Sequence, residues 1–209
     1  MKKNINPGIY LVIDPSMDET QLINKLKSIL SNKIIAIQIW DNFRPNQHRK
    51  RWIQNICKIG ASYNIPILIN NDWKLLSETD LDGVHFDTPP KDFEKIMQQD
   101  PNAIYGLTCG NNLVNVQWAA HHNLDYISFC SLFPTESAPN CELINFNTIN
   151  KAKEIFKNPI FLSGGIRPEN MKKLQVLDFD GIAVISGIMN AENPVHTINE
   201  YYKNLKPYT

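Results

Sequence analysis

The amino-acid sequence predicts an α/β protein built as a single (β/α)8 TIM barrel over residues 1–209. Two observations predict this fold: eight short apolar runs, and helical periodicity in the segments between them. Runs that are apolar throughout are typical of parallel strands, because both faces of such strands are covered. Alternating strands and helices specify right-handed βαβ units. Eight units in about 200 residues fit a closed barrel better than the runner-up, an open flavodoxin-like sheet of about five or six strands.

The predicted strands are rich in Val, Ile, Leu and aromatic residues, and polar, Gly or Pro residues follow each of them. The longest stretch without periodicity, Ser131–Leu143, follows the sixth run and is expected to be an active-site loop. In chain order the strands are Ile9–Ile13, Ile34–Ile39, Pro66–Asn70, Gly83–Phe86, Ala103–Leu107, Tyr126–Phe129, Ile160–Leu162 and Gly181–Ile185.

The segments between the runs carry apolar side chains at helical spacing. In Asp18–Leu30, for example, Leu22 and Leu26 fall on one stripe. Asp18, Asn112 and Asn145 stand where a side chain would cap the start of a helix, and Arg167 precedes Pro168 at a first helical turn. The predicted helices are Asp18–Leu30, a helix around Trp52–Gly60, Asp92–Gln98, Leu113–His122, Phe146–Phe156, Pro168–Val176 and Pro194–Leu205, with a short helical stretch in Asp72–Leu81.

Composition and charge argue against several classes of protein. The chain has 21 Lys and Arg against 21 Asp and Glu, so nothing in its charge favours a nucleic acid or an anionic membrane as partner. No apolar stretch reaches the roughly 20 residues of a membrane span, and the first residues do not read as a signal peptide. The four cysteines form no zinc-like pair, and Cys57 is expected to be a small buried side chain. We therefore expect reduced thiols and a cytoplasmic location. The sequence leaves open whether the protein forms a homo-oligomer.

Residues that directly follow the runs are candidates for a binding site, because the loops after the strands form the site in such barrels. Two turns are the most informative: Gly164 and Gly165 after the seventh run, and Ser186 and Gly187 after the eighth. Both offer unobstructed N–H groups and lead into a helix, whose N-terminus carries partial positive charge. Either turn alone is typical of any tight connection. The pair, at these two strands, predicts that a phosphate monoester binds there.

Short motifs in a fixed order also carry a resemblance to a known family. They are Gly8–Asp14, Ile37–Ile39, Leu68–Asp72, Asp82–Phe86, Asp125–Ile127, Phe133–Ser137, Ser163–Ile166 and Asp180–Ile188. In their order and spacing these motifs resemble the thiamine phosphate synthase and TenI-like thiazole tautomerase superfamily, with its segments V-Q-L, I-I-N-D, D-G-V-H-L and F-P-T-x-T. The resemblance covers nearly the whole chain and implies the same (β/α)8 barrel.

The resemblance implies a transferase of thiamine biosynthesis that joins a pyrimidine diphosphate to a thiazole phosphate, releases pyrophosphate and uses magnesium (Mg2+). Such catalysis is mainly electrostatic, because metal and cationic side chains stabilise the departing diphosphate. The roles carried over by position fall into three groups. They are Gln38, Asn71 and Thr108 as catalytic residues at the pyrimidine and diphosphate, Asp72 as a magnesium ligand, and Thr135, Ser137, Gly164, Gly165, Ile185 and Ser186 as contacts of the thiazole and its phosphate.

The chain departs from the family pattern at positions that would hold the diphosphate. Where the family reads R-E-K after the second strand, this chain has Trp40, Asp41 and Asn42. The lysine of P-T-x-T-K is replaced by Ala138, and the second magnesium aspartate falls on Pro90. Other basic side chains would have to bind the diphosphate in place of the missing ones (a diphosphate clamp), although each of them alone is typical of a solvated surface. These bases are Arg44, Arg49, Lys74, Lys91 and Arg167.

The missing cations leave two alternatives open. A TenI-like tautomerase keeps a phosphate site and needs no diphosphate clamp, but the histidine that such enzymes carry after the fifth strand is Gly110 here. His85 is available, yet its place within a strand favours an inward packing role. The other alternative is a catalytically inactive paralog that still binds a phosphorylated ligand. Under each hypothesis the ligand is a small phosphorylated heterocycle.

Overall fold

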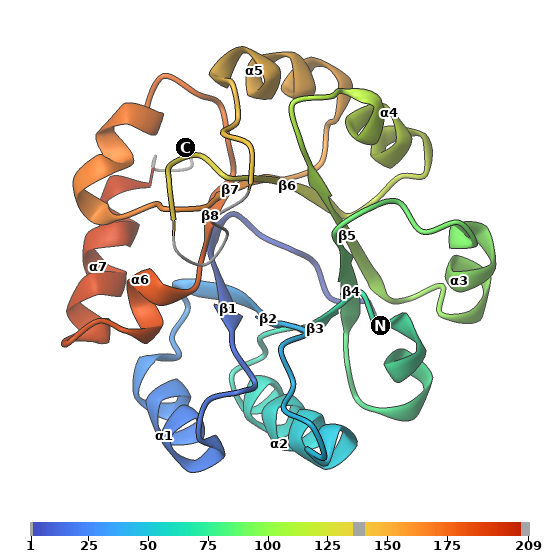
Figure 1. The fold of residues 1–209 in the computed structure, drawn as a ribbon, viewed down its shortest axis with the longest axis vertical. Helices are drawn as coiled ribbons and strands as arrows, with labels where there is room; N and C mark the ends of the chain where they lie inside the picture. The colour runs from blue at the N-terminus through green and yellow to red at the C-terminus, as the bar shows by residue number, and fades with distance from the viewer. Residues whose placement is uncertain (1, 136–140, 206–209) are drawn as a thin grey trace.

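The structure of the chain is a computed structural model that describes residues 2–135 and 141–205. Eight parallel strands close into a barrel, and the helices form a ring around it (Figure 1). Each strand pairs with the next one along the chain, and β8 pairs with β1. The predicted (β/α)8 barrel is confirmed, and the open flavodoxin-like sheet is wrong. The strands are β1 (Gly8–Ile13), β2 (Ile34–Ile39), β3 (Ile67–Asn70), β4 (Gly83–Phe86), β5 (Ile104–Cys109), β6 (Tyr126–Cys130), β7 (Ile160–Ser163) and β8 (Gly181–Val184).

Helices follow most of the strands, close to where the periodicity predicts them. The short helical stretch expected in Asp72–Leu81 is present as a 3-10 helix. One connection is tighter than expected, because the segment predicted as the helix Pro168–Val176 also folds as a 3-10 helix. A 3-10 helix suits a short connection that must reverse within a few residues. The helices are α1 (Glu19–Ile29), α2 (Arg49–Ser62), η1 (Trp73–Glu78), α3 (Phe93–Gln99), α4 (Val114–His121), α5 (Phe146–Ile155), η2 (Pro168–Leu174), α6 (Ser186–Met189) and α7 (Pro194–Asn204).

The expected caps at Asp18 and Asn145 are present, and Arg167 precedes Pro168 at the start of η2. The expectation for Asn112 is wrong, because the N-cap of α4 is Leu113 and Asn112 instead accepts a hydrogen bond from the backbone N–H of Val114 at 2.9 Å. Asp18 Oδ1 accepts a hydrogen bond from the backbone N–H of Gln21 at 2.9 Å, and Asn145 Oδ1 accepts one from Asn147 at 2.9 Å. Each bond satisfies one of the N–H groups that have no partner within the helix. The positions at which α1 and α5 begin are therefore fixed by local sequence.

Apolar side chains fill two regions of the molecule. The larger core lies between the strands and the surrounding helices. The smaller one, which we call the interior cluster, lies inside the barrel and is rich in aromatic rings, with the centroids of Tyr10 and Tyr126 5.5 Å apart. Alternate residues of each strand point to the two regions, as the pleat of a strand requires. The interior cluster consists of Ile5, Tyr10, Val12, Ala36, Leu68, Ile104, Tyr126 and Phe161.

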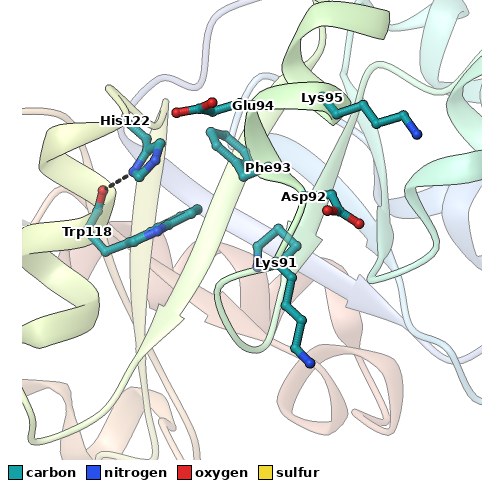
Figure 2. A pocket seen from close by; sticks show the side chains of 8 residues that line it. Lys91, Asp92, Phe93, Glu94, Lys95, Trp118 and His122 are labelled. Atoms are coloured by element: carbon teal, nitrogen blue, oxygen red, sulfur yellow. Dashed lines mark hydrogen bonds between the residues drawn. The ribbon is translucent and has the colours of Figure 1, made fainter.

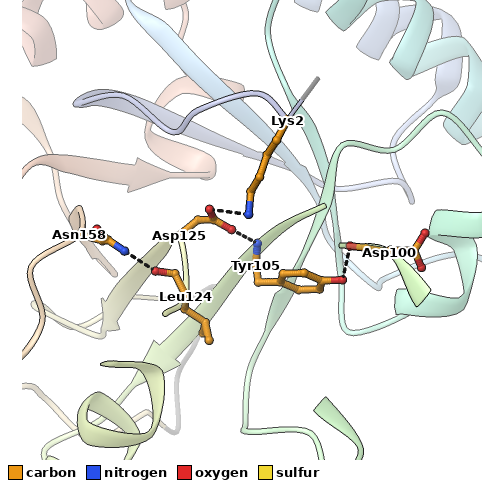
Figure 3. Close-up of polar contacts among 6 residues, drawn as sticks. All are labelled: Lys2, Asp100, Tyr105, Leu124, Asp125 and Asn158. Atoms are coloured by element: carbon orange, nitrogen blue, oxygen red, sulfur yellow. Dashed lines mark hydrogen bonds and ion pairs between the residues drawn. The ribbon is translucent and has the colours of Figure 1, made fainter. Parts of the chain in front are cut away.

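The start of the chain binds to the barrel at the amino ends of the strands (Figure 3). Lys2 Nζ lies 2.8 Å from Asp125 Oδ1, and Asp125 Oδ2 accepts a hydrogen bond from the backbone N–H of Tyr105 at 2.7 Å. The Tyr105 hydroxyl donates to the carbonyl of Asp100 at 2.8 Å. These contacts are structural, so the residues that follow the strands at the other end of the barrel are the better candidates for chemistry. We call that other end the mouth.

Two smaller expectations concern cysteines and membranes. Cys57 is buried, and burial raises the pKa of its thiol to about 12, which confirms its expected role as a small apolar side chain. In the two described stretches, no helix combines the length and the apolar character that crossing a bilayer requires.

Candidate active site at the mouth of the barrel

The two predicted turns lie next to each other at the mouth. β7 and β8 are neighbouring strands, with Ser163 opposite Ala183, so the chain leaves both strands at the same edge of the sheet. Gly164 has a φ of +86° and Gly165 a φ of +63°. L-residues with side chains rarely adopt this left-handed region. Glycine is therefore required in this turn by the backbone itself.

The Gly164–Gly165 turn is also in close contact with the loop that follows β6. A Cβ atom on Gly164 would lie 2.6 Å from the Cα of Ser131 and still closer to its hydroxyl. A Cβ atom on Gly165 would lie 2.6 Å from the carbonyl oxygen of Pro134. The backbone N–H of Phe133 donates to the carbonyl of Gly164 at 3.0 Å. The absence of side chains thus lets two loops of the mouth pack backbone to backbone.

The N–H groups of the two turns are available to a ligand. Within residues 2–135 and 141–205, no hydrogen-bond acceptor is assigned to the N–H groups of Gly164 and Gly165. Ser186 is the first residue of α6, where N–H groups have no partner within the helix. From α7, the Tyr201 hydroxyl donates to the carbonyl of Ile166 at 2.8 Å and occupies the space that a Cβ atom on Gly187 would need. Tyr201 therefore braces both turns at once.

Gln38 lies inside the barrel on β2, with only 7% of its surface exposed. Its Oε1 accepts a hydrogen bond from the Tyr10 hydroxyl at 3.0 Å, and its Nε2 donates to Asn70 Oδ1 at 2.5 Å. Asn70 Nδ2 in turn donates to Asp87 Oδ2 at 2.9 Å. Each amide is therefore held at both ends, which fixes its orientation before any ligand arrives.

Asn71 lies beside these residues and depends on the same carboxylate. Its Nδ2 donates to Asp87 Oδ2 at 2.7 Å and to Asp41 Oδ2 at 3.4 Å, and its Oδ1 accepts from the backbone N–H of Asp87 at 3.0 Å. Asn71 has a φ of +56°, a conformation that asparagine tolerates better than most residues. Asp72 follows, half-buried, and its carboxylate does not cap η1.

Thr108 and His85 lie next to each other on β5 and β4. Thr108 Oγ1 is 2.8 Å from His85 Nε2, and His85 Nδ1 is 2.9 Å from the Tyr126 hydroxyl. The His85 ring is buried, and this burial lowers its pKa to about 4. His85 is therefore neutral at pH 7 and points inward, as its position within a strand predicts.

The low pKa of His85 makes stability depend on pH. In the unfolded chain a histidine takes up a proton near pH 6.5, whereas folded His85 resists protonation down to about pH 4. Its contribution is thus fully present above pH 6.5 and is lost as the pH falls toward 4, with an expected loss of about 3 kcal/mol. Urea unfolding between pH 7.5 and about 4 measures this. His85→Gln should lack this part of the pH dependence, and identical curves for the two proteins would contradict the assignment.

Of the remaining residues implied by the resemblance, Thr135 and Ile185 lie within the described part of the chain, at the same mouth. Thr135 is half-buried at the end of the first described stretch, while Ser137 and Ala138 fall in residues 136–140, outside the described residues. Ile185 caps α6. The side chains of Ile185 and Trp40 both pack against the interior cluster. Trp40 therefore covers part of the barrel interior next to β2.

The bases that would have to rebuild a diphosphate clamp all have exposed side chains. The guanidinium of Arg49 lies over the ring of Phe43, 5.1 Å from its centroid. The others, Arg44, Lys74, Lys91 and Arg167, are likewise exposed, as expected for a solvated surface. These five bases are therefore placed where a solvated surface would have them.

A metal ion would find few protein ligands here. Among the residues that the structure describes, no group of three or more His, Cys, Asp or Glu side chains gathers so that it could hold a metal ion. Asp72 offers one carboxylate, and Pro90 has no side-chain atom that can bind a metal ion. Pro90 lines an outer groove of about 280 Å³ between α3 and α4, together with Phe93, Trp118 and His122 (Figure 2). A magnesium ion at Asp72 would thus depend on oxygens from substrate and water, which is common for this ion.

Two members of this site, Tyr10 and Tyr126, were not candidates for it in the sequence. Their hydroxyl groups bond to each other at 2.7 Å inside the barrel, and Tyr10 also bonds to Gln38. A signal was nevertheless present, because polar side chains such as Gln38 interrupt otherwise apolar runs. A polar residue inside a buried strand needs a hydrogen-bonding partner, but the sequence does not say which one.

Together, the closed barrel, the paired glycine turns and the polar side chains at the mouth define a (β/α)8-barrel protein of the class whose ligand site forms at the carboxyl ends of its strands. The model of the thiamine monophosphate synthase family matches residues 9–188. The chain belongs to this family.

Individual relatives agree with that membership. A thiamine-phosphate synthase of Picrophilus torridus is 29% identical over 95% of this chain and 97% of its own length. One of Clostridium tetani is 29% identical over 91% of this chain and 92% of its own. A solved structure, the thiamine phosphate pyrophosphorylase from Pyrococcus furiosus, superposes with a TM-score of 0.78 at 23% identity and covers 94% of each chain. At that identity the superposition shows the fold.

Proposed function

We propose that the chain is a thiamine-phosphate synthase, a transferase that joins a pyrimidine diphosphate to a thiazole phosphate and releases pyrophosphate. The observation that carries the proposal is the pair of adjacent turns after β7 and β8. In the described part of the chain, no acceptor is assigned to the N–H groups of Gly164 and Gly165, which supports binding of an anion there. Family membership and relatives with this name over nearly the full length support it. The thiazole phosphate would bind at these turns.

At the thiazole end, the proposed contacts are the backbone N–H groups of Gly164, Gly165 and Ser186, with Ile185 beside them. Backbone N–H groups that converge on one point bind phosphate oxygens without help from a charged side chain. Thr135 and Ser137 would add hydroxyl groups from the loop after β6. This division needs no lysine at position 138, which makes the proposal compatible with Ala138.

At the pyrimidine end, the proposed contacts are Gln38, Asn71 and Thr108, and Asp72 would hold a magnesium ion together with the diphosphate. When bound, magnesium would neutralise charge that develops on the departing diphosphate. Gln38 and Asn71 would orient the heterocycle, because their own amides are already fixed by Asn70 and Asp87. Rigid amides of this kind lower the cost of positioning a ligand.

Wider properties follow as proposals. We propose that residues 1–209 act as one domain, which a barrel closed between β1 and β8 supports. The proposed ligands are small phosphorylated heterocycles rather than nucleic acids, in keeping with a formal charge of zero. A cytoplasmic location is in keeping with the free thiols of Cys57, Cys109, Cys130 and Cys141.

The proposed function is tested by product formation. Purified protein with the pyrimidine diphosphate, the thiazole phosphate and magnesium should release pyrophosphate and form thiamine phosphate in equal amounts. Leaving out the thiazole phosphate serves as the control. Background turnover with saturable thiazole phosphate binding would instead favour a TenI-like tautomerase or an inactive paralog. Absence of both turnover and binding would overturn the phosphate site itself.

A further inference from the structure

A continuous chain of hydrogen bonds crosses the interior of the barrel and reaches the mouth at both ends. It begins at the carboxylate of Asp87 and ends at the hydroxyl of Thr108. The links are Asp87 Oδ2 to Asn70 Nδ2 (2.9 Å), Asn70 Oδ1 to Gln38 Nε2 (2.5 Å), Gln38 Oε1 to the Tyr10 hydroxyl (3.0 Å), Tyr10 to the Tyr126 hydroxyl (2.7 Å), Tyr126 to His85 Nδ1 (2.9 Å) and His85 Nε2 to Thr108 Oγ1 (2.8 Å).

The carboxylate of Asp87 dictates the direction of the first three links. An ionised carboxylate only accepts hydrogen bonds, so Asn70 must present its NH2 group to Asp87. The oxygen of Asn70 then faces Gln38 and must receive its NH2 group. This leaves the oxygen of Gln38 for the hydroxyl proton of Tyr10. No other orientation of the two amides satisfies all three contacts.

The direction of the remaining three hydrogen bonds follows, because each group along them has only one proton to donate. A hydroxyl carries one proton, and Tyr10 has given its own to Gln38, so Tyr126 must donate to Tyr10. Tyr126 in turn has no proton left for His85, so His85 Nδ1 must carry the hydrogen. A neutral imidazole has only one N–H group. His85 Nε2 is therefore an acceptor and receives the hydroxyl proton of Thr108.

The hydroxyl of Thr108 consequently has lone pairs, but no free proton, to offer to a ligand at the mouth. Ser128 Oγ lies 3.4 Å from Thr108 Oγ1 and, with the Thr108 proton already used, it is the partner that donates. A phosphate oxygen, which only accepts, would bind Thr108 solely by breaking its bond to buried His85. A ligand group that donates an N–H bond would meet no such cost.

We propose that Asp87 is a specificity-determining residue that acts through this chain: it fixes His85 as the Nδ1–H tautomer and makes Thr108 an acceptor for a ligand N–H group, such as the exocyclic amine of an aminopyrimidine. The choice of an aminopyrimidine rests on the proposed function. The direction of the hydrogen bonds from Asp87 to Thr108 does not rest on the proposed function, because it follows from the hydrogen-bond contacts alone. The amine, rather than the diphosphate, then lies over Thr108.

The tautomer of His85 tests the direction independently of any ligand. Nitrogen NMR of protein labelled at its five histidines, with His85→Gln to assign the signal, should show Nδ1 protonated in the wild type. Asp87→Asn keeps an oxygen that can accept from both neighbouring amides and should preserve this tautomer. Asp87→Leu removes the acceptor and should give a mixture of tautomers. Asp178→Leu, an exposed carboxylate before β8, is the matched control.

Either of two NMR results would overturn the proposal. One is an Nε2–H tautomer in the wild type, a result that depends on no variant folding. The other is an unchanged tautomer in folded Asp87→Leu.

Ligand discrimination tests the consequence at Thr108. Wild type should bind an aminopyrimidine phosphate roughly tenfold more tightly than the analogue in which hydrogen replaces the amine, as one hydrogen bond would give. Asp87→Asn should keep this ratio, Asp87→Leu should lower it because only part of the population keeps the wild-type tautomer, and Thr108→Val should bring it near one. Equal binding of the two ligands by wild type would contradict the proposal. If neither ligand binds while the tautomer of His85 is as expected, the proposed function fails, and the direction of the hydrogen bonds from Asp87 to Thr108 is still supported.

Discussion

Gly164→Ala is expected to lower the free energy of unfolding by about 2–5 kcal/mol and to abolish binding of the thiazole phosphate. The φ of +86° is costly for a residue with a side chain, and the added methyl group would overlap Ser131. The left-handed backbone conformation costs about 1–2 kcal/mol, and the overlap with Ser131 costs about 1–3 kcal/mol. Urea unfolding measures the stability, and calorimetric titration with thiazole phosphate measures the binding.

Gly110→Ala provides a matched control for stability. A Cβ atom on Gly110 meets nothing within 4 Å, and its φ lies outside the left-handed region. This substitution should change the free energy of unfolding by less than about 0.5 kcal/mol. Equal stability of Gly164→Ala and Gly110→Ala would contradict the requirement for glycine after β7. A stable Gly164→Ala protein that still binds the thiazole phosphate would remove the turn from the proposed site.

Asp72→Asn is expected to reduce magnesium-dependent release of pyrophosphate by roughly a hundredfold or more. The substitution keeps the size of the side chain and removes the one carboxylate that the proposal gives to the metal. Because Asp72 makes no capping bond to η1, the fold should be retained. Initial rates at several magnesium concentrations measure the effect, and the magnesium concentration that gives the half-maximal rate should also rise if the carboxylate binds the ion directly.

Asp92→Asn is the corresponding control. Asp92 begins α3 without a capping side-chain bond and lines the outer groove rather than the mouth (Figure 2). Its substitution should leave the rate within about twofold of wild type, as expected for a surface change. A similar loss of rate in both variants would point to a general effect of charge. An unchanged rate in Asp72→Asn would take this residue out of the proposed mechanism.

Local sequence was sufficient to place the strands. β2 spans Ile34–Ile39 and β4 spans Gly83–Phe86, as the apolar runs predict, because a strand covered on both faces has no alternative to burial. The start of α1 was predictable for a different reason, since Asp18 and the N–H group that it caps are only three residues apart. Features that depend on neighbours in sequence are readable from sequence.

The short connections were less readable. η2 replaces the helix expected after β7, and the short helical stretch expected after β3 is the 3-10 helix η1. Whether such a segment forms an α- or a 3-10 helix depends on the distance that it must cover between two strands, and that distance is set by closure of the barrel. α6, with residues Ser186–Met189, is likewise too short to leave a periodic pattern.

The sequence by itself determined the barrel and the glycines of the turns after β7 and β8, because apolar runs and glycine act through their own backbone. Only the tertiary structure decided which polar side chains meet inside the barrel. Tyr10 and Tyr126 are separated by 116 positions, and Tyr10 and Gln38 by 28, yet their hydroxyl and amide groups bond directly. The register of neighbouring strands brings them together, and burial away from water obliges each of them to find its partner there.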